Sequence, residues 1–134
     1  MSSIIEIEGI GEVYAQKLQE VGVPTTESLL EQGATPRGRK TLADSTGISE
    51  RLILKWVNRA DLFRINGIGE QYSDLLAAAG VETVLELAQR RPDHLHAKLV
   101  ETNEAKKLVR VVPSLEHVTD WVQQAHHLAR VVSY

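Results

Sequence analysis

A pair of near-identical segments in the two halves of the chain constrains its fold more than any other sequence feature. Ile7 begins the segment Ile-Glu-Gly-Ile-Gly-Glu-Val-Tyr, and Ile65 begins Ile-Asn-Gly-Ile-Gly-Glu-Gln-Tyr. Both copies continue with a leucine, a Gly-Val pair and a threonine at matching positions. Because such self-similarity indicates two copies of one supersecondary unit, we predict modules at residues 1–62 and 63–134, packed with pseudo-twofold symmetry.

The C-terminal parts of the two copies also match, but they lie at different distances from the glycine pair. Trp56-Val57 precedes an alanine in the first copy, and Trp121-Val122 precedes an alanine in the second. The distance from the glycine pair to the tryptophan is seven residues longer in the second copy. We therefore expect an insertion in that copy, near residues 100–111.

Helix caps and apolar periodicity predict an all-α protein without strands. Glycine ends the first helix of each copy, and Thr83 with Glu86 has the spacing of a capping box. Residues 33–40 are expected to form a loop that leads into the next helix. The predicted helices cover residues 11–21, 25–32, 40–45, 49–63, 69–79, 83–89, 92–101 and 114–130.

The turns Gly9-Ile10-Gly11 and Gly67-Ile68-Gly69 resemble the hairpin of the helix-hairpin-helix family. Glycine accepts the positive φ that a short turn between helices needs, and the isoleucine can fill the angle between the helices. The turn leaves free N–H groups at the start of the next helix, which together with the helix dipole can hold an anion. In this family the usual anion is a DNA phosphate, and a backbone contact of this kind carries no sequence information.

The chain as a whole, over nearly all of residues 5–130, resembles a bacterial family catalogued only as a domain of unknown function, with the same tandem arrangement. The most specific stretches are residues 60–69 and the Gly-Val-Glu-Thr link at residues 80–83. The resemblance implies the fold and supplies no activity. The wider helix-hairpin-helix group includes non-specific DNA-binding modules and protein-association modules, and fold alone does not decide between them.

Basic residues near the turns favour duplex DNA as the partner. The densest basic segment, Arg37 to Lys40, is expected in a loop that could clamp phosphates. Arg64 lies just before the second turn, whereas Glu6 stands at the aligned position of the first, so the second turn is the better candidate. The candidate nucleic-acid site comprises Gly9, Ile10, Gly11, Gly67, Ile68, Gly69, Arg64, Arg37, Arg39 and Lys40.

Charge favours the alternative, in which the hairpins are only architecture and the partner is another protein. Glu12 and Glu70 follow the second glycine of each turn, where they satisfy the helix dipole and repel a phosphate. The formal net charge of −3 also lacks the basic surplus of a typical nucleic-acid binder. Both hypotheses stay open on the sequence.

Several function classes are not expected. The chain has no cysteine, which excludes disulfides, thiolate metal sites and cysteine nucleophiles. No catalytic motif stands out, and the five histidines lack the spacing of converging ligands, so we expect no enzyme, cofactor or metal. We expect no membrane span and a cytoplasmic location. The final helix, residues 114–130, is expected to dock beside the first hairpin, either within one chain or across a homodimer.

Overall fold

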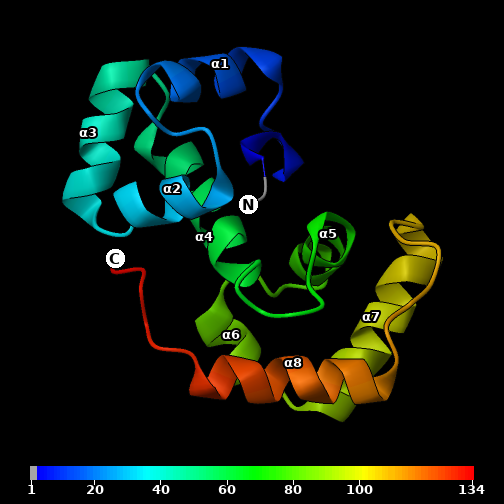
Figure 1. Cartoon of the computed structure of the whole chain (residues 1–134). Helices are drawn as coiled ribbons and strands as arrows, with labels where there is room; N and C mark the ends of the chain where they lie inside the picture. The colour runs from blue at the N-terminus through cyan, green and yellow to red at the C-terminus, as the bar shows by residue number, and fades with distance from the viewer. Residues whose placement is uncertain (1–2) are drawn as a thin grey trace. The chain divides into compact units, whose positions relative to one another are not determined.

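The computed structural model describes residues 3–134, and every regular element in that range is helical (Figure 1). This confirms the prediction of an all-α fold. A single turn of 3-10 helix, η1 (Ile4–Glu6), comes first. The α-helices are α1 (Glu12–Glu20), α2 (Thr26–Gln32), α3 (Pro36–Thr46), α4 (Glu50–Leu62), α5 (Glu70–Ala78), α6 (Val84–Ala88), α7 (Pro92–Lys106) and α8 (Leu115–His127).

Within the described range, none of these helices has the length and apolar character needed to cross a lipid bilayer.

The helices belong to two compact units. Unit 1 contains the described residues through Asp61 together with Arg130–Tyr134, and unit 2 contains Leu62–Ala129. The C-terminal five residues had been assigned to the second module. They join unit 1 because the Ser133 N–H donates to the Ala34 carbonyl at 2.8 Å, a contact that sequence patterns do not reveal.

Helix α3 of unit 1 begins earlier than predicted. Thr35 caps it by accepting a hydrogen bond from the Gly38 N–H, and Pro36 occupies its first turn. The expectation of a loop over residues 33–40 is therefore wrong for residues 36–40. A threonine followed by proline is a helix start, because the hydroxyl replaces a missing acceptor and proline lacks the N–H that would be left unpaired.

The capping boxes also differ from the prediction. In unit 1, Thr25 and Ser28 cap each other's backbone reciprocally at the start of α2. In unit 2, Thr83 accepts from the Glu86 N–H as expected. The Glu86 carboxylate, however, accepts from the Glu82 N–H at 3.1 Å instead of closing the box.

The core of unit 1 is built around one face of α4, from which Ile53, Trp56, Val57 and Ala60 are buried. The remaining buried apolar side chains of this unit come from η1, the first glycine turn, α1, α2, α3 and the C-terminal segment. They are Ile4, Ile7, Ile10, Ala15, Leu18, Val23, Leu29, Leu42, Ile48 and Val132.

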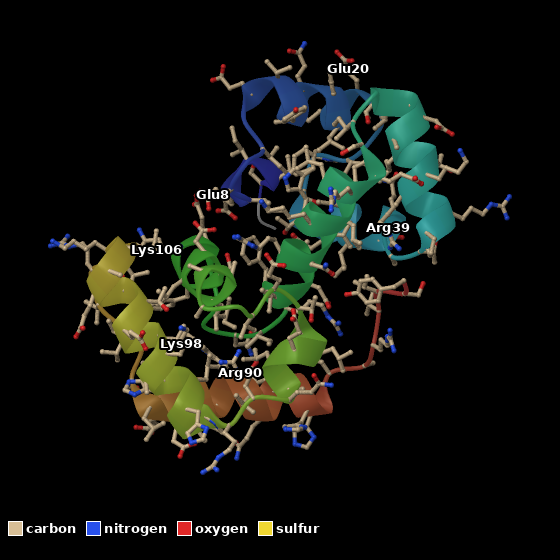
Figure 2. All side chains as sticks on the ribbon, turned by 180° about the vertical axis from the view of Figure 1, so that it is seen from behind. Glu8, Glu20, Arg39, Arg90, Lys98 and Lys106 are labelled. Carbon is tan, nitrogen blue, oxygen red and sulfur yellow. The ribbon has the colours of Figure 1, made fainter. Side chains whose placement is uncertain are left out.

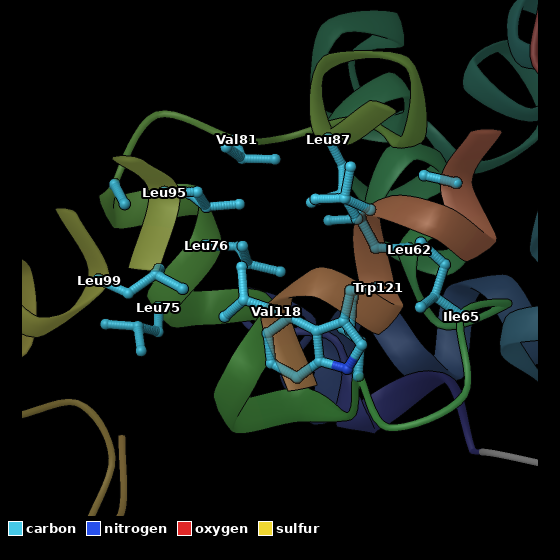
Figure 3. Close-up of a cluster of buried hydrophobic side chains, with 14 of the residues drawn as sticks. Leu62, Ile65, Leu75, Leu76, Val81, Leu87, Leu95, Leu99, Val118 and Trp121 are labelled. Carbon is cyan, nitrogen blue, oxygen red and sulfur yellow. The ribbon is translucent and has the colours of Figure 1, made fainter. Parts of the chain in front are cut away.

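The core of unit 2 is a cluster of leucine, valine and isoleucine side chains around Trp121 (Figure 3). Helix α8 packs on α6 and α7, and α5 packs on α7. The final helix therefore packs within its own unit, where its Val118, Trp121 and Val122 face fills the core of unit 2. Docking of this helix beside the first glycine turn, within one chain or across a homodimer, stays a prediction.

The residues of the predicted insertion, near 100–111, lie in the last part of α7 and in the connection that follows it. Helix α7 runs to Lys106 and ends at Lys107 in the left-handed conformation, with φ of 51°. The Asn103 side chain then fixes the connection: it accepts from the Val109 N–H at 2.9 Å and donates to the Val109 carbonyl at 3.0 Å. A short, ordered connection thus leads into α8.

Candidate functional site

The two glycine turns have the same local geometry. Gly9 has φ of 94° and Gly67 has φ of 99°, a region that favours glycine. In each turn the isoleucine N–H, that of Ile10 or Ile68, donates to the carbonyl three residues earlier at 3.1 Å. Both isoleucine side chains are buried. The turns are thus closed and packed from within.

A tryptophan from the last helix of the same unit lies against each turn. A Cβ added to Gly67 would lie 2.8 Å from Trp121 Nε1, and a Cβ added to Gly9 would lie 3.4 Å from Trp56 Nε1. Trp56 Nε1 is buried without a hydrogen-bond acceptor in the described chain, so packing sets its position. Close contact and φ therefore both require glycine at Gly67, whereas at Gly9 the requirement comes from φ.

A tyrosine covers each tryptophan. The ring centroids of Tyr14 and Trp56 are 5.2 Å apart, and those of Tyr72 and Trp121 are 5.4 Å apart, both in tilted arrangements that suit aromatic pairs. The Tyr72 hydroxyl also donates to the Val111 carbonyl at 2.9 Å. Each turn thus sits on a tyrosine–tryptophan pair, a contact that the sequence repeat hints at only through its aligned aromatic positions.

The second turn is also held by side chains of unit 2. Gln124 accepts from the Asn66 N–H at 2.9 Å and donates to the Asn66 carbonyl at 3.1 Å. The predicted phosphate ligand Arg64 is half-buried and donates to the Ala129 carbonyl at 3.1 Å. The hairpin that the sequence favoured for DNA is therefore extensively bonded within its own unit.

The glycine turns lead directly into the N-termini of α1 and α5. Gly11 and Gly69 are exposed N-caps without a side-chain hydrogen bond to the first turn. N–H groups at such a position can bind an anion. Each first turn, however, carries an exposed glutamate, Glu12 or Glu70, which opposes the approach of a phosphate.

The basic residues of α3 divide into two exposed side chains and a buried one. Arg37 and Lys40 are exposed, and Lys40 forms an ion pair with Asp44 at 3.5 Å. Arg37 also borders a surface hollow of about 360 Å³. These two cations share unit 1 with the first glycine turn, whereas Arg64 and the second turn belong to unit 2.

Arg39 is a structural residue in this fold (Figure 2). It is 5% exposed, and it donates to the Gly33 carbonyl at 2.8 Å and to the Ser133 carbonyl at 2.7 Å. Burial lowers the pKa of its guanidinium, while Tyr134 and Glu50 act in the opposite direction. Because Arg39 is buried and both Nη1 and Nη2 donate inside unit 1, the prediction that it belongs to the phosphate site is wrong.

An exposed apolar surface was missed by the sequence reasoning. The connection between α7 and α8 displays Leu108 and Val111, which are 39% and 72% exposed, and Leu115, the first residue of α8, is 45% exposed. We call residues 107–115 the apolar loop. The signal available in the sequence was the predicted insertion near residues 100–111, which contains leucine and valine.

No group of three or more histidine, aspartate or glutamate side chains within residues 3–134 has the arrangement of a metal site.

One family matches most of the chain. The model of a family described as "Domain of unknown function (DUF4332)" matches residues 8–128. No curated protein and no solved structure matches the chain.

Proposed function

The chain belongs to the DUF4332 family, whose description names no activity, and we propose that it is a non-catalytic module that binds another protein. In this proposal the chain is a tandem of two helix-hairpin-helix modules related by a pseudo-twofold axis. The glycine hairpins are architecture: they turn the chain over a tyrosine–tryptophan pair and need no external ligand.

The apolar loop is the observation that carries this proposal. Val111 exposes 72% of its surface although the loop around it is ordered by the Asn103 and Tyr72 hydrogen bonds. An ordered loop that presents several large apolar side chains to water gains stability when a partner covers them. Connecting segments on a rigid scaffold are also where binding functions concentrate.

The contacts and charges at the two hairpins also favour a protein partner, because they disfavour DNA. Trp121 and Gln124 engage the second turn from within unit 2, and Arg64 bonds to a carbonyl of that unit. Glu12 and Glu70 place negative charge where a phosphate would approach. Internal contacts and charge together account for the shared geometry of the two turns without DNA.

Photo-crosslinking tests this proposal. A photo-reactive phenylalanine replaces Val111 in one variant and Glu104, exposed on α7, in the control variant, and both are expressed in the cells that produce the protein. We expect a discrete adduct at residue 111 that protease destroys and nuclease leaves intact. No adduct, equal adducts at both positions, or an adduct sensitive to nuclease would contradict the proposal.

Non-specific DNA binding is the second candidate. The uncapped, exposed N-termini of α1 and α5 favour it, and so do the two exposed cations on α3, Arg37 and Lys40. Phosphate binding by such groups is electrostatic, so affinity falls steeply as salt rises, with a log–log slope of about 0.9 for each neutralised phosphate.

Fluorescence anisotropy on a labelled random-sequence duplex distinguishes the candidates. Binding at low salt that the double variant Arg37→Glu, Lys40→Glu abolishes would establish the DNA candidate. The control variant Lys106→Glu, Lys107→Glu makes the same change of net charge at exposed positions in unit 2. Our protein-binding proposal predicts no saturable binding to the duplex by any of the three chains.

A further inference from the structure

The C-terminal segment, residues 130–134, is held in unit 1 like a bound peptide. The Ser133 N–H donates to the Ala34 carbonyl at 2.8 Å, and the Ser133 carbonyl accepts from Arg39 Nη2 at 2.7 Å. Both backbone groups of one residue are thus satisfied by groups of unit 1. Such main-chain recognition is typical of proteins that bind an extended segment.

The Arg39 side chain, which α3 contributes to the site, is oriented by contacts that do not involve the segment. The other guanidinium nitrogen of Arg39, Nη1, donates to the Gly33 carbonyl at 2.8 Å. Gly33 in turn is fixed because its N–H donates to the Leu29 carbonyl of α2 at 2.8 Å. The rigid fork of arginine therefore presents Nη2 in the direction of Ser133 through a contact with Gly33 that does not involve the segment.

Side chains on both sides of Ser133 add selectivity. Val132 is 3% exposed, so this position requires an apolar side chain. The Tyr134 hydroxyl donates to Asn58 Oδ1 at 2.8 Å, and the Arg130 guanidinium lies 5.8 Å from the centre of the Tyr134 ring. The site thus recognises backbone at one residue, an apolar side chain before it and a hydroxylated aromatic after it.

The site opens to solvent. Arg39 forms part of the wall of a surface hollow of about 310 Å³ that Glu50, Arg51 and Leu54 also line. Ser133 and Tyr134 are exposed, whereas Val132 is buried in the core of unit 1. Exchange of the segment therefore removes and restores this one core side chain.

We propose that this surface of unit 1 is a binding site for an extended segment, and that the 130–134 segment of a second copy of the chain occupies it in exchange with the chain's own. The segment follows Ala129, the last residue of unit 2, and every contact that holds it in unit 1 is non-covalent. A second copy carries the same Val132, Ser133 and Tyr134, so the same contacts form whichever chain supplies them. Exchange of an identical element between protomers costs few new contacts. The proposal concerns a surface of unit 1, whereas the proposed function above depends on the apolar loop of unit 2.

Paired cysteines in the otherwise cysteine-free chain provide the test. The Ser133 N to Ala34 O distance of 2.8 Å places the two Cα atoms within about 7 Å by standard backbone dimensions. A short bis-maleimide can therefore join Ala34→Cys to Ser133→Cys. The single variants Ala34→Cys and Ser133→Cys are mixed, unfolded in urea, refolded together at high protein concentration and treated with the cross-linker. The control mixture replaces Ala34→Cys by Ser45→Cys, which is exposed on α3.

We expect the first mixture to give clearly more covalent heterodimer than the control mixture. We also expect the cross-linker to join the two cysteines within one chain in the double variant Ala34→Cys, Ser133→Cys at low protein concentration. Adding Arg39→Lys, with folding checked by circular dichroism, should reduce the heterodimer yield about tenfold, the equivalent of one hydrogen bond to a charged group. Heterodimers at the control level alongside normal closure of the double variant would overturn exchange with a second copy. Failure of the double variant to close would overturn the binding site itself. Neither result affects the photo-crosslinked adduct expected at residue 111, which tests the proposed function.

Discussion

Substituting alanine for Gly67 and, separately, for Gly80 isolates the contact between the second glycine turn and Trp121. Both glycines have nearly the same backbone conformation, with φ of 99° and 96°. A Cβ at Gly67 meets Trp121 Nε1 at 2.8 Å, whereas a Cβ at Gly80 meets nothing within 4 Å. Both positions and the tryptophan belong to unit 2, so the comparison lies within one folding unit.

The expected costs follow from these contacts. The left-handed conformation costs a residue with a Cβ about 1–2 kcal/mol at either position. At Gly67 the new methyl group must also displace a buried indole, and overpacking of this kind adds about 1–3 kcal/mol. The free energy of unfolding should therefore fall by about 1–3 kcal/mol more in Gly67→Ala than in Gly80→Ala.

Urea denaturation followed by near-ultraviolet circular dichroism and by tryptophan fluorescence measures the difference, with an unchanged m-value as evidence that only stability has changed. The substitution Trp121→Phe removes Nε1, so in that background the additional cost at Gly67 should disappear. Equal costs for the two glycine substitutions, or an additional cost that persists with Trp121→Phe, would refute the contact between turn and indole.

Three further substitutions test other parts of the structure. Arg39→Met removes two charge-assisted hydrogen bonds and should lower the free energy of unfolding of unit 1 by about 1.5–3 kcal/mol in a urea titration; no loss would mean that the C-terminal segment is not held as described. Gln124→Ala should cost about 0.5–1.5 kcal/mol and speed amide exchange at Asn66, and an unchanged exchange rate would argue against the clamp on the second turn. Val111→Asp should change stability by less than about 0.5 kcal/mol because its side chain is exposed, and a large loss in thermal unfolding would show that the side chain is buried.

Local signals in the sequence predicted much of the helical structure. Thr83 caps α6 as predicted, and the helices predicted to start at residues 25, 92 and 114 begin within one residue of those positions. These features depend on residues within one turn of each other, so a short window of sequence contains the information. The start of α3 is indicated in the same way, by Thr35 and Pro36, although residues 33–40 were predicted to form a loop.

Contacts between distant residues could not be read from the sequence in this way. Arg39 was expected at the surface because arginine is usually exposed, yet its partner Ser133 lies 94 positions further along the chain. The docking of α8 on α6 and α7 depends on which partner covers its apolar face, and periodicity identifies the face without naming the partner. Arg39 therefore left the candidate phosphate site. A charged side chain can bind a phosphate only with donors that do not already form hydrogen bonds within the protein.

The central claim, that the glycine hairpins are architecture, is tested most directly by amide NMR of the ¹⁵N-labelled chain titrated with a short random-sequence duplex at low salt. We predict that the amide resonances of Gly11 and Gly69, at the uncapped N-termini of α1 and α5, keep their positions throughout the titration. Saturable, salt-sensitive shifts centred on these two amides would contradict the claim and assign both turns to phosphate binding.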